Sequence, residues 1–454
     1  MIILKVLLVD PEKRRPSINL SLGYIGEFLK YNGIDANFLN RFSLKRDEKL
    51  RKMIKRISPD IVGISSVTAN FNSAIEVADI CKDVNDDIKV VFGGYHPTAL
   101  PVETLKNKSV DFVVIGEGEH TMLELVREIE KDGKNFEKIC GISFKKGKNI
   151  KITKNRSLIQ NIDSIPMPHP FLPIGRYSNM SFYPLIKLKH GTIMTSRGCP
   201  MSCKFCSIKL IFKNQYRTHS IDRVMEEIKY LNDKGINIIS FSDSIFTCNK
   251  KRVKDICKNI IKEKFDIKWS CFGHINFVDK EVLYWMKKAG CIFIKYGIES
   301  GNQSILNSMN KNININKIKE AISLTKKIDI TTSLNFIIGF PSETLETAMQ
   351  TINLAKDLNC ISFFRSLTPY PGTEIYDWAK KNNLLLENNF EKFTPENVVM
   401  TNGKLNESEI KSLIRVGYKK IFLTPKALVM LRNVKNPYRF FYYMSTIKDF
   451  ISQL

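Results

Sequence analysis

Residues 195–207, TSRGCPMSCKFCS, decide the fold and the chemistry of this 454-residue chain, because they place three cysteines in one short loop. The spacing CxxxCxxC joins Cys199, Cys203 and Cys206, and the aromatic Phe205 comes directly before the last of them. Iron–sulfur clusters are held by cysteine thiolates, usually four of them. Three thiolates on a four-iron cluster would leave one iron with an open coordination position, where a metal site does chemistry. The loop therefore predicts a catalytic [4Fe-4S] cluster with these three cysteines as metal ligands.

A structural zinc site is the alternative for this loop. Zinc takes four ligands in such sites, usually from paired CxxC units. His190 and His219 lie outside the loop and offer no clean fourth ligand, so the cluster is favoured. The remaining cysteines stand mostly in apolar contexts, and we expect buried small side chains rather than disulfides. They are Cys81, Cys140, Cys248, Cys257, Cys271, Cys291 and Cys360.

The sequence around this loop alternates apolar strand-like runs with amphipathic helical segments. The expected strands cover residues 192–198, 237–244, 267–274, 291–300, 331–340 and 360–370. Six such units predict a partial (β/α)6 version of the eightfold barrel, in which functional residues lie at the C-terminal ends of the strands. The cluster loop ends the first expected strand, which is the position that this architecture requires.

The first part of the chain has the same alternation in a different architecture. Expected strands at 5–10, 34–40, 60–67, 89–94 and 111–119 are separated by helical segments at 22–33, 47–58, 72–84 and 121–132. Strands that read as continuous apolar runs indicate a parallel sheet covered on both faces. We therefore predict an α/β, doubly wound, flavodoxin-like domain.

The alternation of strands and helices stops between these two regions. Residues 141–155 read as a β-hairpin turning at 145–148, and residues 157–176 hold four prolines, which favour an extended connector. The region after the last barrel strand is mostly helical in pattern. The predicted division is 1–138 for the first domain, 139–185 for a linker with a hairpin, 186–380 for the barrel and 381–454 for a helical C-terminal region.

Composition limits the location and the partners of the chain. Hydrophobic residues make up 43%, enough for packed cores. No run of 18 or more uncharged apolar residues occurs, so no transmembrane segment is predicted. The N-terminus lacks the leading positive charge of a signal peptide and reads as a first strand, so we expect a cytoplasmic protein.

The formal net charge of +24 permits nucleic acid, anionic lipid or an anionic substrate. The lysines are spread along the whole chain, and no basic run with interleaved aromatics resembles a nucleic-acid module, so nucleic acid is not expected. Phe440, Phe441, Tyr442 and Tyr443 stand among basic residues and would allow peripheral contact with a membrane or a lipid-like substrate. Packing of these aromatics against the barrel is the favoured interpretation.

The motifs of residues 186–375 resemble the radical S-adenosylmethionine superfamily, whose hallmark is CxxxCxΦC at this place. TSRGCPMSCKFCS is similar to the family's cluster loop, and YRTHSIDRVMEEI is similar to the segment that follows that loop. Three strand ends of the family also have counterparts. They are the fourth-strand motif in GIES at 297–300, the fifth-strand motif in GFPSET at 339–344 and the sixth-strand end in TPYPGT at 368–373. The resemblance implies that the open iron binds S-adenosylmethionine. Reductive cleavage of that molecule would then yield a 5′-deoxyadenosyl radical that abstracts hydrogen from the substrate.

Several residues gain expected roles from this resemblance. Glu299 and Ser300 fall where the acid would contact the ribose of S-adenosylmethionine, although a salt bridge between Glu299 and a basic neighbour is the alternative. Gly339 and Pro341 would shape backbone near the adenine and methionine parts. Phe205, inside the cluster loop, is counted with these cofactor-binding residues.

Two further positions depart from the family or leave their role open. Asp243 would meet the ammonium group of S-adenosylmethionine or serve a structural role, and Ser244 stands where a second Asp is usual. His274 stands where the third strand often ends in Arg. We take His274 as a candidate catalytic residue, for substrate contact or proton transfer, with polar lining of the barrel as the alternative.

Loops at the strand ends of the first domain predict a second cofactor. Open parallel sheets bind ligands at these ends, and glycines let a ligand approach the backbone. The residues concerned are Ser65, Ser66, Thr68, Gly93, Gly94, Gly116, Glu117 and Gly118, with Glu119 ending the last loop. The segments SPDIVGISSVT, VVFGGYHPTALPVETL and DFVVIGEGEHTMLEL resemble the cobalamin-binding domain that precedes many radical S-adenosylmethionine barrels. The resemblance implies that these loops bury the nucleotide tail of cobalamin.

Many cobalamin proteins ligate cobalt through a histidine in a DxHxxG motif after the first strand. Residues 10–23, DPEKRRPSINLSLG, contain no histidine. The expectation is therefore cobalamin without a His lower ligand, or a domain that has lost cobalamin. Lys13, Arg14 and Arg15 would face the corrin amides or the substrate, but solvated charge is the favoured interpretation.

The leading functional hypothesis is a cobalamin-dependent radical methyltransferase (class B) acting on an unactivated carbon of a small-molecule or lipid-like substrate, with an external electron donor such as flavodoxin or ferredoxin. The alternative is a non-methylating cyclase, ring-rearranging or carbon-coupling enzyme of the anaerobic magnesium-protoporphyrin monomethyl ester cyclase type. Methylthiolation would need three more cysteines in the first domain, where only Cys81 and Cys140 precede the barrel. A non-enzymatic cobalamin sensor would not need the cluster cysteines.

Overall fold

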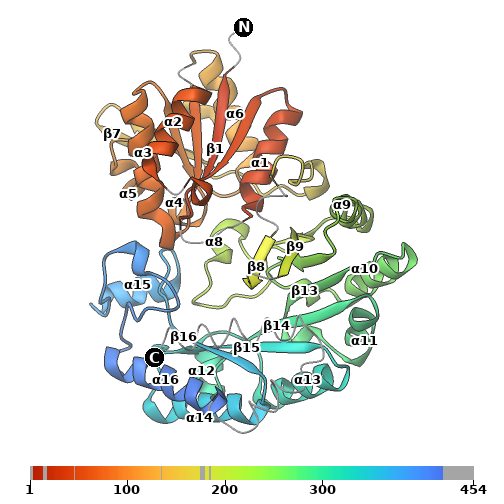
Figure 1. Cartoon of the computed structure of the whole chain (residues 1–454). Coiled ribbons are helices and arrows are strands. Elements are labelled where there is room, and N and C mark those ends of the chain that lie inside the picture. Colours follow the sequence, from red (N-terminus) through yellow and green to blue (C-terminus); the bar gives the residue numbers. More distant parts are fainter. Residues whose placement is uncertain are drawn as a thin grey trace.

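The computed structural model of the chain describes residues 4–13, 18–44, 46–133, 135–173, 179–183 and 186–422. Arg14, Arg15 and the aromatic group 440–443, for which the sequence offered interpretations, lie outside these residues. Within the described part of the chain, no helix is both long enough and apolar enough to cross a membrane. The chain forms two lobes, with the first domain above and the barrel below in Figure 1.

The first domain is built on a twisted sheet in the order β2-β1-β3-β4-β5-β6-β7. Its parallel strands are β1 (Lys5–Asp10), β2 (Asp35–Asn40), β3 (Ile61–Ser65), β4 (Lys89–Gly93) and β5 (Phe112–Val114). The helices are α1 (Leu20–Tyr31), α2 (Asp47–Ile57), α3 (Phe71–Val84), α4 (Tyr95–Ala99), α5 (Pro101–Lys106) and α6 (Glu119–Glu130). The predicted doubly wound domain is confirmed.

Alternate residues of each central strand serve two separate cores, one on each face of the sheet. In β1, Val6 and Leu8 pack with α1 and α6, whereas Leu7 and Val9 pack with α2 and α3. Burial on both faces is the physical reason why these strands are apolar throughout. The same covering leaves only the strand ends accessible to a ligand.

The predicted hairpin consists of β6 (Ile142–Lys146) and β7 (Asn149–Ile152), paired antiparallel. Strand β6 also pairs antiparallel with β5, through Val113 opposite Ser143. The sequence placed this hairpin in a linker between the domains, whereas the structure places it at the edge of the first sheet. A hairpin leaves an unpaired backbone edge, and pairing with β5 satisfies it.

The second sheet has the order β16-β15-β14-β13-β12-β9-β8. Its parallel strands are β9 (Ile186–Ile193), β12 (Ile238–Phe241), β13 (Lys268–Gly273), β14 (Cys291–Glu299), β15 (Thr331–Ile338) and β16 (Ile361–Ser366); β8 (Asn179–Tyr183) pairs antiparallel with β9. The expected partial barrel of six β/α units is confirmed by this arrangement.

The first barrel strand was predicted too late, at residues 192–198. Strand β9 ends at Ile193, and Ser196–Arg197 form a separate short strand, β10, paired antiparallel with β11 (Arg217–Thr218). The cause is a distant residue: the carboxylate of Asp243 takes the backbone N–H of Thr195 at 2.6 Å and so draws this segment away from the parallel ladder. The cluster loop therefore leaves from a two-stranded ribbon instead of from the barrel sheet.

Helices cover the outer face of the barrel and enclose its core (Figure 1). They are α9 (Ile221–Asp233), α10 (Lys250–Lys262), α11 (Lys280–Lys288), α13 (Ile315–Lys327), α14 (Leu345–Leu358) and α16 (Glu407–Phe422); shorter helices are α8 (Ile208–Phe212), α12 (Gln303–Ser308) and α15 (Glu374–Lys381). Five of the six longer helices begin at a side chain that accepts the N–H three residues on, which stabilises a helix start. These caps are Ser220, Asn249, Asp279, Asn314 and Thr344.

The described part of the C-terminal region, up to Phe422, contains helix α16 and a loop at 385–400, whose ends Leu385 and Met400 pair antiparallel. Helix α16 packs on the barrel, and Tyr418 donates to the carbonyl of Phe364 at 3.2 Å. This loop reaches the first domain, where the ring of Phe390 lies 4.6 Å from that of His96. This region therefore contacts both lobes.

Candidate active site

The cluster loop follows β10 and is shaped by a glycine that no other residue can replace. Gly198 has φ +86°, and a Cβ at this position would lie 1.9 Å from the carbonyl oxygen of Gln215. L-residues with a side chain rarely adopt this conformation. The backbone then folds back so that the N–H of Met201 donates to Cys199 Sγ at 3.4 Å.

The loop brings the three predicted cysteines together at the edge of the barrel. Cys199 and Cys203 are buried and Cys206 is half-buried. Burial raises the pKa of each thiol, and the charge of a neighbouring thiolate adds to this effect. A bound cation reverses that preference and deprotonates coordinating thiols. The three side chains therefore suit a metal group that compensates their charge.

The cysteines can also be compared with the zinc site that is the alternative for this loop. No group of three or more His, Cys, Asp or Glu side chains in the described residues is arranged to hold a metal ion. A zinc ion needs its ligands around one point. Three loop cysteines are one short of the four ligands of a structural zinc site, whereas a four-iron cluster on three thiolates would keep one iron open.

A buried lysine accompanies the cysteines, and sequence reasoning missed it. Lys311 Nζ lies 2.8 Å from Glu299 Oε1, with both side chains about nine-tenths buried. Glu299 and the thiols of Cys203 and Cys206 raise the pKa of Lys311 against the opposing effect of burial. The basic partner that the sequence left as an alternative for Glu299 is therefore present. Lys311 follows α12 and carries no pattern that distinguishes it from the many surface lysines.

Glu299 stands in an irregular stretch of strand. It has φ +68°, and the register between β14 and β15 shifts between Gly297 and Glu299. Left-handed backbone at a residue with a side chain costs energy and persists where function requires it. A Cβ on Gly297 would meet Glu299 Oε1 at 2.2 Å, so the GIES motif needs its glycine to admit this carboxylate.

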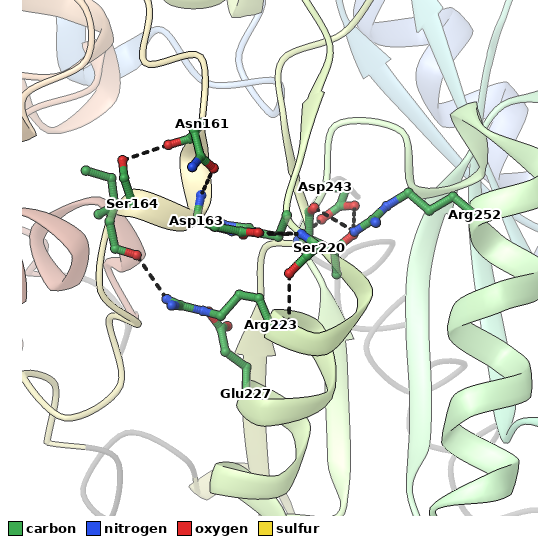
Figure 2. A network of polar contacts seen from close by, with 11 residues as sticks. Asn161, Asp163, Ser164, Ser220, Arg223, Glu227, Asp243 and Arg252 are labelled. Carbon is green, nitrogen blue, oxygen red and sulfur yellow. Dashed lines mark hydrogen bonds and ion pairs between the residues drawn. The ribbon is translucent and has the colours of Figure 1, made fainter.

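Asp243 is fully buried at the end of β12 and supports the segment before the cluster loop. Its carboxylate accepts the N–H and the hydroxyl of Thr195, each at 2.6 Å, and the hydroxyl of Ser196 at 2.8 Å. Arg252 donates to the carbonyl of Thr195 at 3.1 Å, and Figure 2 shows its side chain reaching from α10 toward Asp243. Burial raises the pKa of Asp243, while these donors lower it. These contacts favour the structural role that the sequence left open.

His274 ends β13 as expected and holds a defined tautomer. Its backbone N–H donates to Thr247 Oγ1 at 3.0 Å, and its Nδ1 accepts the N–H of Asn276 at 3.3 Å. A neutral ring that accepts at Nδ1 carries its proton at Nε2. Nε2 is buried and meets no partner among the described residues. Burial and Lys311 lower the pKa of His274 to about 3, so this side chain is a neutral hydrogen-bond donor and not an acid at ordinary pH.

The other barrel residues named from the sequence serve the shape of the strand ends. Gly339 has φ +95° and donates its N–H to Glu343 Oε2 at 2.6 Å. Burial raises the pKa of Glu343 to about 7. Pro341 follows in the same turn. Ser300 Oγ lies 3.1 Å from Thr351 Oγ1 and so connects the end of β14 to α14.

The connector between the domains is fastened to the start of α9 (Figure 2). Asp163 accepts the N–H of Ser220 at 2.9 Å, and Arg223 bonds Glu227 at 3.0 Å and the carbonyl of Ile165 at 3.2 Å. Since α9 follows directly after β11, these bonds also hold the ribbon from which the cluster loop leaves.

The strand ends of the first domain border a cavity of about 230 Å³ that is partly open to solvent. Its lining includes Ser65, Gly93, Gly94, Gly116, Glu117 and Gly118, which the sequence predicted. Its floor is apolar, with Leu8, Ile64, Val91, Phe92 and Met122. An apolar slot bordered by glycine backbone fits an aromatic base on a flexible tail, which is the form of the cobalamin nucleotide.

The glycines of this cavity are fixed by geometry. Gly94 has φ +101°, and a Cβ there would lie 2.4 Å from the carbonyl oxygen of Ser66. Gly116 has φ +85° with open space around its missing side chain. Thr68 differs from the expectation, because it lines a second cavity instead of this one.

The second cavity lies between the two domains and has a volume of about 1040 Å³. From the first domain it is lined by Val67, Thr68 and Tyr95, and from the barrel by Phe205, Asn335 and other residues of the strand ends. Phe205 thus joins the cluster loop to the wall of this cavity. The arrangement can place a cofactor of the first domain opposite the cluster, with a substrate between them.

Comparison with known proteins agrees with both halves of the molecule. Residues 193–355 match the radical SAM superfamily, and residues 14–126 match the B12 binding domain. An uncharacterized methyltransferase of Pyrococcus horikoshii is 39% identical over 384 residues, which cover 84% of this chain and 82% of the relative. The anaerobic magnesium-protoporphyrin IX monomethyl ester cyclase of Rubrivivax gelatinosus is 28% identical over 443 residues, covering 95% and 78%.

The fold is also that of a solved enzyme. The radical S-adenosylmethionine methyltransferase TsrM of Kitasatospora setae, determined with cobalamin and a [4Fe-4S] cluster bound, aligns with a TM-score of 0.77 over 100% of this chain and 99% of that one, at 15% identity. Two domains, a cluster loop and two cavities define a radical enzyme with a corrinoid domain. The chain belongs to the radical SAM superfamily, in the group that carries a B12-binding domain. Its cofactors are a [4Fe-4S] cluster, S-adenosylmethionine and cobalamin, and enzymes of this superfamily need a reductant.

Proposed function

We propose that this enzyme methylates an unactivated carbon of a small-molecule or lipid-like substrate, using Cys199, Cys203 and Cys206 to hold its cluster. The observation that carries the proposal is the cavity between the domains. Its walls come from the strand ends of the corrinoid domain on one side and from the cluster loop, through Phe205, on the other. A substrate carbon in this cavity would lie between a methyl source and a radical source.

When bound, the cluster and S-adenosylmethionine supply the radical that removes hydrogen from the substrate, and cobalamin supplies the methyl group. The chain's own residues bind and orient. Lys311 and Glu299 present a buried cation and anion beside the thiols, which suits the carboxylate and the ribose hydroxyls of S-adenosylmethionine. His274 offers the N–H at Nε2 without exchanging a proton. Phe205, Tyr95 and Phe393 surround the cavity with aromatic surface that excludes water.

The experiment follows the two half-reactions separately, because the substrate is not identified. The reconstituted full chain is incubated anaerobically with titanium(III) citrate, hydroxocobalamin and S-adenosylmethionine labelled in its methyl group. We expect both S-adenosylhomocysteine and 5′-deoxyadenosine, with label transferred to cobalamin. Cys203→Ala should abolish 5′-deoxyadenosine and leave S-adenosylhomocysteine. Cys140→Ala, a half-buried cysteine of the first domain, is the matched control and should keep both products.

A second function follows from one comparison. The relative from Rubrivivax gelatinosus that covers 95% of this chain is a magnesium-protoporphyrin IX monomethyl ester cyclase. A non-methylating radical enzyme would form 5′-deoxyadenosine without S-adenosylhomocysteine. That outcome would contradict methylation and favour the cyclase type, whereas absence of both products would contradict each function.

An external redox protein such as flavodoxin or ferredoxin is the electron donor that we propose. The net charge of +24 favours an acidic partner, because complementary charge accelerates encounter. With an acidic flavodoxin and its reductase in place of titanium(III) citrate, 5′-deoxyadenosine formation should fall as salt increases. No dependence on salt would contradict electrostatic docking.

A further inference from the structure

The carboxylate of Glu117 joins the corrinoid domain to the cluster ribbon. Glu117 belongs to the loop after β5, and both of its oxygens face arginines from the barrel side. Arg197 Nη1 lies 3.0 Å from Oε1, and Arg217 contacts Oε1 and Oε2 at 3.0 and 2.8 Å. The N–H of Ile159 donates to Oε2 at 2.9 Å. The arginines and this N–H lower the pKa of Glu117 against the opposing effect of burial, so it stays charged.

Arg197 extends the same network to a second carboxylate and to an aromatic ring. Its Nη2 lies 2.7 Å from Glu119 Oε1, and its guanidinium lies over the ring of Tyr24 at 4.8 Å from the centroid. The side chains of the two arginines and the two glutamates are only 4–7% exposed. Two cations and two anions are thus fully desolvated at one domain contact, where removing any one leaves an unpaired buried charge.

This network is also part of the support of the cluster loop. Arg197 stands two residues before Cys199, and it pairs with Arg217 across the ribbon of β10 and β11. Gly198 follows β10 directly, and a Cβ there would lie 1.9 Å from the carbonyl oxygen of Gln215, two residues before β11. Displacing Glu117 would therefore move both strands of the ribbon that carries the loop.

The cavity of the first domain is bounded by the same elements. Besides Glu117 and Glu119, its lining includes Met194 and Arg197 before the cluster cysteines, and Ile211 and Phe212 after them. One wall of the predicted cobalamin cavity therefore consists of residues that flank the cluster loop on both sides. A ligand that fills the cavity would contact the residues that support the cluster loop.

We propose that Arg197 is a positioning residue that couples occupancy of this cavity to the geometry of the cluster loop. The proposal rests on the proposed function only in taking cobalamin as the occupant. Cobalamin in the cavity would fix the loop 116–119, which holds Arg197 and, through it, the ribbon. Coupling between two sites is reciprocal, so an assembled cluster would in turn favour cobalamin binding.

The test measures how fast an iron chelator removes the cluster from the anaerobic full chain, with and without hydroxocobalamin. The key variant is Glu119→Gln, which removes one charge from the network but keeps its size and its hydrogen-bonding capacity. Glu124→Gln is the matched control, because Glu124 lies on the same helix and pairs with Arg156 at the surface. Thermal unfolding checks that each variant is folded, and equilibrium dialysis gives the Kd for hydroxocobalamin.

In the wild type and in Glu124→Gln, we expect hydroxocobalamin to slow iron loss about tenfold, within the ~5- to 150-fold range of allosteric coupling. In Glu119→Gln this protection should shrink to about twofold or less at saturating hydroxocobalamin. The presence of the cluster, which should lower the Kd for hydroxocobalamin in the wild type, should also have little effect on that Kd in the variant. Equal protection in Glu119→Gln and wild type would show that cobalamin merely shields the cluster, and would overturn the coupling alone. Failure of the wild type to bind hydroxocobalamin would overturn both the coupling and the cobalamin step of the proposed function.

Should Glu119→Gln not fold, Arg197→Lys provides a second variant. Lysine keeps the charge but cannot span Glu117 and Glu119 as the planar guanidinium does. The same loss of protection is expected, and full protection would again overturn the coupling.

Discussion

Replacing Asp243 with alanine should loosen the segment that supports the cluster loop. The carboxylate accepts three hydrogen bonds, from the N–H of Thr195 and from the hydroxyls of Thr195 and Ser196. A buried donor that loses its partner costs about 1–3 kcal/mol. The hydroxyls can rotate toward other acceptors, whereas the backbone N–H cannot, so the N–H accounts for most of the loss.

One effect opposes this loss. Burial raises the pKa of Asp243, which means that the folded protein sustains a cost for keeping the carboxylate charged, and alanine removes that cost. The donors and the charge of Arg252 lower the pKa of Asp243 without cancelling the effect of burial, so the relief offsets part of the loss. We expect Asp243→Ala to lower the free energy of unfolding by about 2 kcal/mol, and Asp243→Asn, which keeps one acceptor for the N–H, by about 1 kcal/mol.

The assay is urea unfolding of the cluster-free chain, followed by iron content after reconstitution. Asp243→Ala should bind less iron than the wild type, because Thr195 and Ser196 precede the cluster loop. Asp266→Ala is the control, since Asp266 is 91% exposed and pairs only at the surface with Lys268. Wild-type stability together with full iron content in Asp243→Ala would refute the positioning role.

Three further predictions test other parts of the site. Gly198→Ala should abolish cluster retention, because the added Cβ would meet the backbone of Gln215. Gly33→Ala is the control: its φ of +82° is similar but the space around it is open, so it should cost only about 1 kcal/mol of stability and keep the iron. Equal iron loss in the two variants would contradict the steric argument. Glu343 has a pKa of about 7 in the folded protein against an ordinary 4.5, so its contribution to stability is full at low pH and decreases by about 3 kcal/mol as pH rises from 4.5 to 7. Glu343→Gln should flatten the dependence of the unfolding free energy on pH, measured by urea unfolding at several pH values. An unchanged pH dependence would refute this assignment. His274→Ala should slow 5′-deoxyadenosine formation by about two- to tenfold, which is the value of one hydrogen bond. The pH profile of the reaction between pH 6 and 8 should not change, because His274 stays neutral in that range. A shifted profile would show that His274 titrates between pH 6 and 8.

The sequence predicted the two folds because their signals are local. Each central strand of the first domain is apolar on both faces, and most barrel helices begin at a capping residue close to their apolar stripe. The cluster cysteines lie within eight residues of one another, so their spacing alone indicates a shared site. These features need no knowledge of distant contacts.

The features that the sequence did not predict all depend on distant contacts. The first barrel strand ends early because Asp243, 48 positions away, captures Thr195. The hairpin joins the first sheet because the edge of β5 is free to pair with β6. Neither partner can be recognised from the segment itself.

Buried charged residues were the other feature that was not predicted from the sequence. Lys311, Arg197 and Arg217 are three of 70 basic residues, and sequence reasoning treated such residues as solvated. One signal pointed to the arginines: Glu117 and Glu119 stand in a loop between a buried strand and a helix, where charges need partners. The predicted cofactor role of Glu117 was therefore incomplete, because its side chain serves the domain contact while its loop lines the cavity.

The most direct test of the account is the metal content of the protein purified and reconstituted anaerobically with iron, sulfide and hydroxocobalamin. A radical enzyme with a corrinoid domain should retain about four iron and about one cobalt per chain through gel filtration, with the iron lost and the cobalt largely kept in Cys203→Ala. Iron without cobalt would remove cobalamin from the mechanism. A protein that binds no iron, or that keeps its iron in Cys203→Ala, would contradict the central claim.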